Sequence, residues 1–251
     1  MTITTYDESE GLSSVSRALL LSSIREGDLT GEAGLARKIL ASLKPAKEVV
    51  FEFTNDPGQL HQYYRLRDQL FISVWGLNHI PGAEEALDKA SHIMVARQGL
   101  LCVGGGRLTI SSAAHRQLMP MESEDFALGN VLPELDLAQS TYAELSRFAI
   151  MQDFRDDKIF PELLSRFIRR AIAEGVDYLF HAAPLSATKS YRQSVQALGF
   201  DCHTRRDLEI PDREEFDGVK MALSVMDLTS AKTRRAGEAE IAERLPELLA
   251  G

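Results

Sequence analysis

The sequence predicts an α/β protein whose mixed β-sheet is covered by helices, and three observations lead to this prediction. Strand-like and helix-like runs follow one another in the order β-α-loop-β-β-β-α-β-α-β-β. Helices alternate with strands only in the second half, whereas the first strands follow one another as a meander. The 251 residues are 44% hydrophobic and 26% charged, which is typical of one soluble domain with a substantial core.

The first half of the main domain begins near Glu48. The run "EVVFEFT" alternates as a strand does, and Asp56 and Pro57 form a start signal for the helix in "DPGQLHQYYRLRDQLFISVW". The run "SHIMVARQGLLCVGGGRLTI" predicts two strands joined at Gln98 and Gly99 as a hairpin.

The second half follows a long irregular stretch that ends near Ser140. It predicts a strand in "YAELSRFAI", a helix in "FPELLSRFIRRAIAEG", a strand in "VDYLFHAA" and a helix in "SATKSYRQSVQALGF". The runs "CHTRRDLEI" and "VKMALSVMDL" are the expected closing strands. The main domain therefore spans residues 47–229.

Two segments flank this domain. Residues 1–46 contain two helix-like pieces separated by glycine breaks, which predict a helical arm that packs on the domain; a loosely ordered tail is the alternative. Residues 230–251 form a charged C-terminal tail.

Charge, cysteine count and hydropathy exclude several classes of protein. The net charge of −9 argues against nucleic acid as the main partner. No apolar run approaches the ~20 residues of a membrane span, and the acidic N-terminus lacks a signal peptide. Two cysteines without metal spacing indicate the cytoplasm, and six dispersed histidines predict no metal.

A pair of charges in an apolar strand is the most informative local feature. Glu144 and Arg147 lie within the strand predicted from Tyr142, where unpaired buried charges cost several kcal/mol. Residues three apart face opposite sides of a regular strand, unless a bulge re-aims one of them. The two charges either satisfy each other structurally or serve a site.

Four short motifs occur in order on the predicted elements. They are "LRDQLF" (66–71), "GGRL" (105–108), "VLPEL" (131–135) and "ELSRFA" (144–149). Together with the element order they resemble the GNAT acyltransferases. Within that superfamily they resemble the acyl-homoserine-lactone synthases of quorum sensing and the related N-acyl amino acid synthases. The resemblance covers roughly residues 60–228.

The resemblance implies a GNAT-like twisted sheet, with the helical arm as an addition, and an active site at a bulge in the fourth strand. Glu144 is the implied base, and Arg147 is expected to pair with Glu85 or Asp88. The implied substrate-binding residues are Arg67, Phe71, Trp75, Glu85, Asp88, Arg107, Leu132 and Phe148. The fourth and fifth strands are expected to separate and admit the pantetheine arm of an acyl thioester.

The loop "MQDFRDDKI" is the expected phosphate-binding segment, with Arg155 and Lys158 as its cations. It lacks the usual glycine-rich sequence, which favours the phosphopantetheine of an acyl-carrier protein over coenzyme A. The basic run Arg166, Arg169 and Arg170 is either a docking patch for that acidic protein or a solvated helix face. The tyrosine common to many acetyltransferases is Val195 here; Tyr191, one turn earlier, is either a proton donor or packing.

The expected function is an N-acyltransferase that moves a fatty acyl group from a phosphopantetheine thioester to a small amine, without a permanent cofactor. S-adenosylmethionine is the acceptor that the autoinducer synthases imply. Two departures from the family pattern, the spacing of Trp75 and Glu85 in place of Asp, motivate an amino acid as the alternative acceptor, and Leu132 in place of Phe is a further departure. A third possibility is a catalytically silent GNAT module that binds a ligand or a protein partner.

Overall fold

The computed structural model describes residues 48–75, 85–155, 158–211 and 219–230. By its internal contacts the chain divides into two units, residues 1–50 with 98–100, and the remainder. The second unit contains every residue of the site described below. The predicted arm (1–46) and all but the first residue of the tail (230–251) lie outside the described residues.

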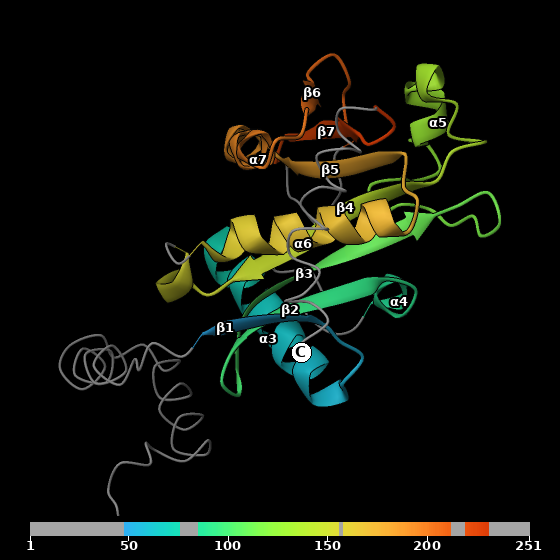
Figure 1. The fold of residues 1–251 in the computed structure, drawn as a ribbon. Helices are drawn as coiled ribbons and strands as arrows, with labels where there is room; N and C mark the ends of the chain where they lie inside the picture. Colours follow the sequence, from blue (N-terminus) through green and yellow to red (C-terminus); the bar gives the residue numbers. More distant parts are fainter. Residues whose placement is uncertain (1–47, 76–84, 156–157, 212–218, 231–251) are drawn as a thin grey trace, which may run out of the picture. The chain divides into compact units, whose positions relative to one another are not determined.

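The second half of the sheet confirms the prediction of a mixed α/β architecture (Figure 1). Strand β4 pairs with β5 in parallel, whereas β3 pairs with β4, β5 with β7, and β6 with β7 in antiparallel register. The full order is β1-β2-β3-β4-β5-β7-β6. The strands are β1 (Val49–Phe53), β2 (His92–Gln98), β3 (Leu101–Ser111), β4 (Tyr142–Ile150), β5 (Tyr178–Pro184), β6 (His203–Arg205) and β7 (Met221–Asp227).

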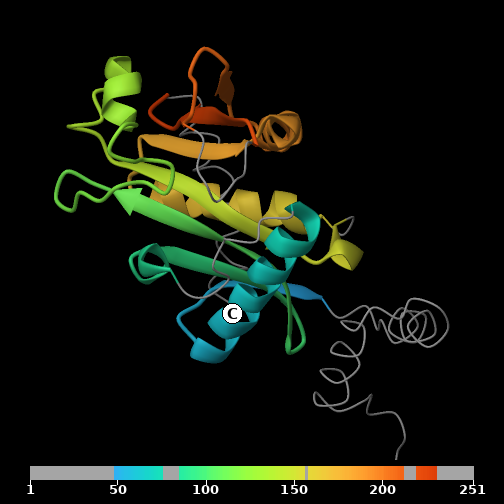
Figure 2. The same ribbon diagram turned by 180° about the vertical axis from the view of Figure 1, so that it is seen from behind.

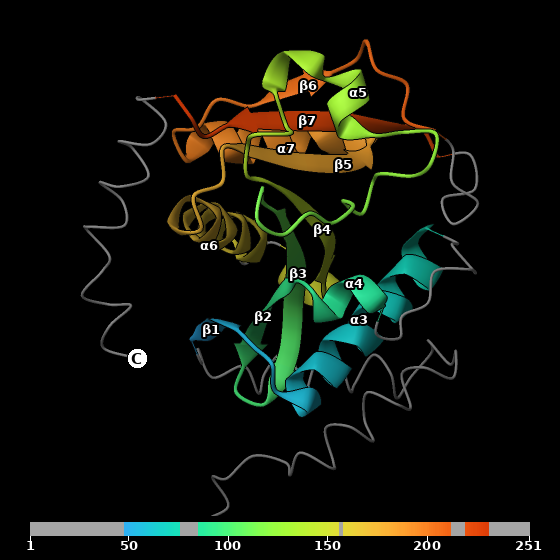
Figure 3. The ribbon, with the colours of Figure 1, turned by 90° about the vertical axis from the view of Figure 1, so that its right-hand side faces the viewer.

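Helices lie on both faces of the sheet (Figure 3). One face carries α3 (Pro57–Trp75) and α4 (Ala86–Lys89), and the other carries α6 (Ile159–Ala173), which contacts α7 (Leu185–Ala197). Figure 2, from behind, shows α3 crossing in front of the strands and α6 beyond them. The predicted start of α3 is present, because the Asp56 carboxylate accepts a hydrogen bond of 2.8 Å from the Gln59 N–H.

The segment between β3 and β4 contains short helices that the sequence pattern did not indicate. These are α5 (Leu128–Val131) and η2 (Pro133–Leu135); a further turn, η3 (Gln152–Phe154), follows β4. Apolar residues of the β3–β4 segment pack on β4, β5 and β7 and form one core cluster. Its members are Met119, Met121, Phe126, Leu128, Leu132, Leu137, Tyr142, Phe180, Leu223 and Val225.

A glycine allows α3 to approach the sheet closely. A Cβ atom at Gly105 would lie 2.6 Å from Cδ2 of Tyr63 and 2.7 Å from the carbonyl oxygen of Met94, both well inside contact distance. Tyr63 is fully buried here. This close approach places the tyrosine of α3 beside β4, where it reaches the bulge described below.

Among the helices that the structure describes, none combines the length and the hydropathy needed to cross a membrane.

Candidate active site

Strands β4 and β5 separate after a short stretch of pairing. Their parallel register covers three residue pairs and ends at Glu144 opposite Phe180, although β4 continues to Ile150 and β5 to Pro184. Beyond this point β4 is held by β3, and β5 by β7. The separation leaves a gap within the sheet, as the resemblance implied for a pantetheine thioester.

A bulge in β4 lies beside this gap. Gly105 of β3 pairs with Ala149, and Arg107 pairs with Ser146, so β4 contains one residue more than β3 between these pairs. Arg147 is in the bulge with φ of 58°, a left-handed conformation that costs a residue with a Cβ ~1–2 kcal/mol. Its carbonyl oxygen accepts a hydrogen bond of 2.6 Å from the Tyr63 hydroxyl. The predicted bulge is present.

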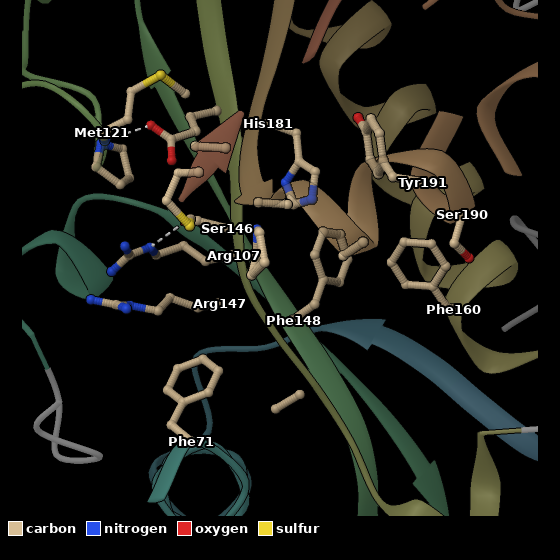
Figure 4. Close-up of a pocket in the computed structure, with 18 of the residues that line it drawn as sticks. Phe71, Arg107, Met121, Ser146, Arg147, Phe148, Phe160, His181, Ser190 and Tyr191 are labelled. Atoms are coloured by element: carbon tan, nitrogen blue, oxygen red, sulfur yellow. Dashed lines mark hydrogen bonds between the residues drawn. The ribbon is translucent and has the colours of Figure 1, made fainter. Parts of the chain in front are cut away.

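The bulge turns Arg147 toward a network of ion pairs that joins α3, α4, β3 and β4. Arg147 donates to Glu85 from Nη2 at 2.6 Å. Arg107 donates from one nitrogen to Glu85 at 2.6 Å and to Asp88 at 2.9 Å. It also donates from Nε to the Ser146 hydroxyl at 3.1 Å (Figure 4).

Arg67 completes the network below the surface. Its two terminal nitrogens bind the two carboxylate oxygens of Asp88 at 3.2 and 3.1 Å, and both side chains are fully buried. The rings of Tyr63 and Tyr64 lie 5.6 and 4.9 Å from its guanidinium. Arg67 and Asp88 therefore support the residues of the site from behind.

These contacts keep both carboxylates ionised. Burial would raise the pKa of the Glu85 carboxyl, but the charges of Arg147, Arg107 and Arg67 outweigh burial and hold that pKa below its usual value. Burial would also raise the pKa of the Asp88 carboxyl, but the hydrogen bonds and the charge of Arg67 outweigh burial and lower that pKa. Three guanidinium groups face two carboxylates here, so the network itself carries a net positive charge.

Glu144 lies on the same side of the sheet as this network. Its side chain is buried, and Oε2 accepts a hydrogen bond of 2.8 Å from the backbone N–H of Met121 (Figure 4). The segment that carries Met121 is itself held by Glu122, whose carboxylate accepts from the N–H groups of Met119 and Leu128, both at 2.8 Å. The β3–β4 segment therefore fixes the position of the Glu144 carboxylate.

A cavity of about 520 Å³ lies against β4 and β5 and is bounded by residues from both faces of the sheet. One end is charged and the other is mainly apolar (Figure 4). The charged end contains Arg107, Glu144, Ser146 and Arg147, with Phe71 nearby. The other end contains Phe148, Phe160, His181, Ser190 and Tyr191. The lining also includes Ile150, Arg155, Ala182, Ala183, Pro184, Ala187, Ile210, Pro211 and Met221.

His181 stands where the two strands begin to separate. Its Nδ1 lies 2.8 Å from the carbonyl oxygen of Leu145, the β4 residue that follows the last strand pair. Because that carbonyl can only accept, Nδ1 carries the proton. Burial lowers the pKa of His181 to about 4, although the hydrogen bond to Leu145 opposes this shift, so the ring is neutral near pH 7.

Aromatic rings hold this histidine in place. The Tyr191 ring is 4.2 Å from the imidazole centroid, and the Phe148 ring lies edge-on at 5.8 Å. Among the described residues the Tyr191 hydroxyl has no hydrogen-bond partner, and burial raises its pKa well above the usual value. The observed contacts of Tyr191 are therefore packing contacts, one of the two roles that the sequence left open for it.

The structure brings part of the predicted site together. Phe71, Arg107, Glu144, Arg147, Phe148 and Arg155 line the cavity. Arg67, Glu85 and Asp88 lie behind it in the ion-pair network, and Lys158 is exposed just before α6. Leu132 differs from the prediction, because it is fully buried in the core cluster and is not among the cavity residues. The side chain of Trp75 lies outside what the structure describes.

Sequence reasoning missed the contributions of Ser146, Phe160 and His181. Ser146 and Phe160 carried no signal of their own. The one sign of His181 was that it is a lone polar residue inside the apolar strand run "YLFHAA". Its role depends on a neighbouring strand, so the local sequence does not indicate that role.

The basic run on α6 is not a free cationic patch. Arg166 pairs with Glu162 at 2.8 Å and lies over the Phe51 ring, and Arg170 pairs with Glu174 at 2.6 Å. Arg169 is 7% exposed and donates to Ser165. Neutralisation by the helix's own glutamates weakens the docking-patch interpretation of this run.

No protein-family model and no curated protein matches the chain. Solved structures do. An N-acyl amino acid synthase from uncultured soil microbes, FeeM, is 14% identical, with a TM-score of 0.50 over 75% of this chain and 97% of that one. The acyl-homoserine-lactone synthase LasI is 18% identical, with a TM-score of 0.47 over 76% and 94% of the two chains.

A putative N-acetyltransferase from Lactobacillus plantarum is 14% identical, with a TM-score of 0.49 over 72% and 98%. At such identities a likeness shows the fold, and the FeeM structure spans most of both chains. With the separated β4 and β5 and the bulge in β4, it confirms the predicted fold: the chain has a GNAT-like fold.

Proposed function

We propose that the protein is an N-acyltransferase that transfers an acyl group from a pantetheine thioester to a small amine. The observation that carries this proposal is the gap between β4 and β5, which opens into a cavity with one charged and one apolar end. An acyl thioester suits the apolar end, and a polar amine suits the charged end. In this proposal the two reactants lie on either side of the bulge.

The donor lies along β4 in this proposal. In this proposal the amides of pantetheine bind β4 beyond its last pair with β5, in the manner of an added strand, at peptide groups other than the carbonyls of Leu145 and Arg147, which accept from His181 and Tyr63. Arg155 lines the cavity, and Lys158 precedes the N-terminus of α6, so these cations and the helix end suit a terminal phosphate. We propose the phosphopantetheine of an acyl-carrier protein as the donor, with coenzyme A as the alternative.

The acceptor carries a carboxylate in this proposal. Arg107 and Arg147 line the charged end, where a guanidinium can bind an anionic group of the substrate, and Arg147 lies over the Phe71 ring there. S-adenosylmethionine meets this requirement, as the motif resemblance implies.

An amino acid meets the same requirement. Glu85, in place of the family's aspartate, binds both Arg107 and Arg147 with its longer side chain, which changes the acceptor pocket and motivates this second candidate.

The chemical step joins the amine nitrogen to the thioester carbon. The C–S bond breaks, the thiolate leaves, and one proton must move from the nitrogen to solvent or sulfur. Glu144, at the charged end, accepts this proton directly or through water. Positioning of the two reactants contributes most of the acceleration, since proximity alone can supply ~7–11 kcal/mol.

The test is thiol release from acyl-carrier proteins and coenzyme A loaded with acyl chains of several lengths, with either S-adenosylmethionine or an amino-acid mixture. Mass spectrometry identifies the product. A homoserine lactone supports the autoinducer reaction, and an acyl amino acid supports the second candidate. Thiol release that does not depend on an acceptor contradicts the proposal. The absence of thiol release with every donor also contradicts it and favours a catalytically silent ligand-binding module.

A further inference from the structure

One polar atom of the apolar end has no role in the proposed reaction. Because Nδ1 of His181 donates to Leu145, its Nε2 is an unprotonated nitrogen that can only accept a hydrogen bond. Among the described residues the only hydrogen bond of this side chain is the one at Nδ1. His181 lines the cavity between the rings of Phe148 and Tyr191, so Nε2 is available to a ligand that enters the cavity.

The position of this atom relates it to one part of the ligand. His181 follows Phe180, the last β5 residue that pairs with β4, and Phe180 is opposite Glu144. In the proposed reaction the reacting carbonyl lies near Glu144 and the bulge. It is therefore at nearly the same level along β5 as His181. The side chain of His181 projects to the α6 and α7 face, where the wall is apolar. In the proposed binding mode the first carbons of the acyl chain therefore pass this imidazole.

A saturated acyl chain offers Nε2 no donor, and a chain that displaces water from this acceptor without replacing its hydrogen bond binds less well. A keto group also lacks a donor. A hydroxyl can donate, and on the β-carbon it lies close to the thioester and within the gap. We propose that His181 is a specificity-determining residue that accepts a hydrogen bond from a hydroxyl on the β-carbon of the acyl chain. This inference rests on the proposed function and names its donor class.

The experiment compares three pantetheine thioesters of one chain length: the β-hydroxyacyl, the β-ketoacyl and the unsubstituted acyl forms. We expect kcat/KM for the hydroxyacyl form to exceed that for the other two by ~5- to 10-fold in the native protein. His181→Phe keeps an aromatic ring and should bring the three values together. The ratio between substrates is independent of the fraction of folded variant, so partial unfolding does not affect it.

Two further variants sharpen the result. His181→Asn can still donate to the Leu145 carbonyl, but it places no acceptor at the position of Nε2, so it should also lose the preference. Ser190→Ala removes a hydroxyl group from the same cavity and should retain the preference. The proposal is overturned if the preference for the hydroxyacyl form persists in both His181 variants, with kcat/KM lowered equally for all three thioesters. It is also overturned if the preference disappears in Ser190→Ala.

Binding of unreactive thioether analogues, measured by calorimetry, separates this inference from the proposed reaction. A preference of the native protein for the hydroxyl-bearing thioether that is lost in His181→Phe supports the inference even without turnover. Equal binding of the three thioethers, with normal turnover of all three thioesters, supports the reaction and rejects the role of His181.

Discussion

The Tyr63 hydroxyl of α3 donates a hydrogen bond of 2.6 Å to the carbonyl oxygen of Arg147 in the bulge of β4. This contact joins a helix on one face of the sheet to the residue with a left-handed backbone, and it involves a fully buried phenol. Burial is the main reason that the pKa of Tyr63 is well above its usual value, so the hydroxyl keeps its proton and remains a donor. Tyr63 is therefore a positioning residue for the bulge.

Replacement of Tyr63 by Phe tests this role. The ring still fills the space beside Gly105, but the Arg147 carbonyl loses its donor, so the bulge is less well held. We expect a loss of ~1 kcal/mol in the free energy of unfolding and a decrease of ~10-fold in kcat with little change in KM for the donor. Tyr178→Phe, at the paired end of β5, is the control. Equal effects on kcat in both variants would reject a positioning role.

Gly105 should not tolerate a side chain. The added Cβ in Gly105→Ala would meet Tyr63 and the Met94 backbone at 2.6 and 2.7 Å, so α3 or β3 must shift. We expect destabilisation of ~1–3 kcal/mol or more in chemical denaturation. Gly129→Ala is the matched control, because nothing lies within 4 Å of its Cβ position. A midpoint of Gly105→Ala within error of the control would contradict the packing account.

Glu144→Gln should retain the fold and lose activity. The Gln amide oxygen can still accept from the Met121 N–H, but an amide cannot take up a proton at neutral pH. We expect kcat to fall by ~10²-fold or more, with a melting temperature near that of the native protein. Glu134→Gln makes the same chemical change at an exposed carboxylate that pairs with Arg205 and does not line the cavity, and should keep kcat. Native turnover in Glu144→Gln would exclude Glu144 as the base.

Acid should destabilise the protein in a window that depends on His181. The folded pKa of about 4 is below the unfolded value near 6.5, so the unfolded chain binds more protons between these values. Stability therefore falls as the pH decreases from about 6.5 to 4, by up to ~3 kcal/mol from this group. The free energy of unfolding of His181→Phe should be lower at pH 7 and less pH-dependent in this window. Parallel curves for the two proteins would show that His181 is not buried in neutral form.

The ion-pair network has a different pH dependence. The pKa values of Glu85 and Asp88 are lowered in the folded state, so their contribution is present above the unfolded values and is lost as the pH falls below about 4. Asp88→Ala leaves the buried guanidiniums of Arg67 and Arg107 without this partner. We expect a loss of ~3–5 kcal/mol at pH 7, measured by denaturant unfolding. A loss below ~1 kcal/mol would contradict the account of the network.

Much of the fold could be predicted because its signals are local. The alternation in "EVVFEFT", the cap at Asp56 and the turn at Gly99 depend on neighbours in the chain, and each appears where it was expected. The α5 and η2 turns were missed because they depend on packing of the β3–β4 segment on the core rather than on a periodic pattern. Leu132 was assigned to the substrate site on its motif position; the same packing buries it in the core cluster, and it is not among the cavity residues.

The sequence by itself determined the order of elements, the mixed sheet and the charged residues whose motifs indicate acyl transfer. Only the tertiary structure decided how these charges combine. Glu144 and Arg147 are three residues apart, and a regular strand would separate their side chains; the bulge, held by Tyr63 across 84 positions of the chain, turns Arg147 to Glu85. His181 likewise acquires a role only because β5 separates from β4 beside Leu145. Both results depend on contacts between segments distant in the chain, and no local pattern encodes them.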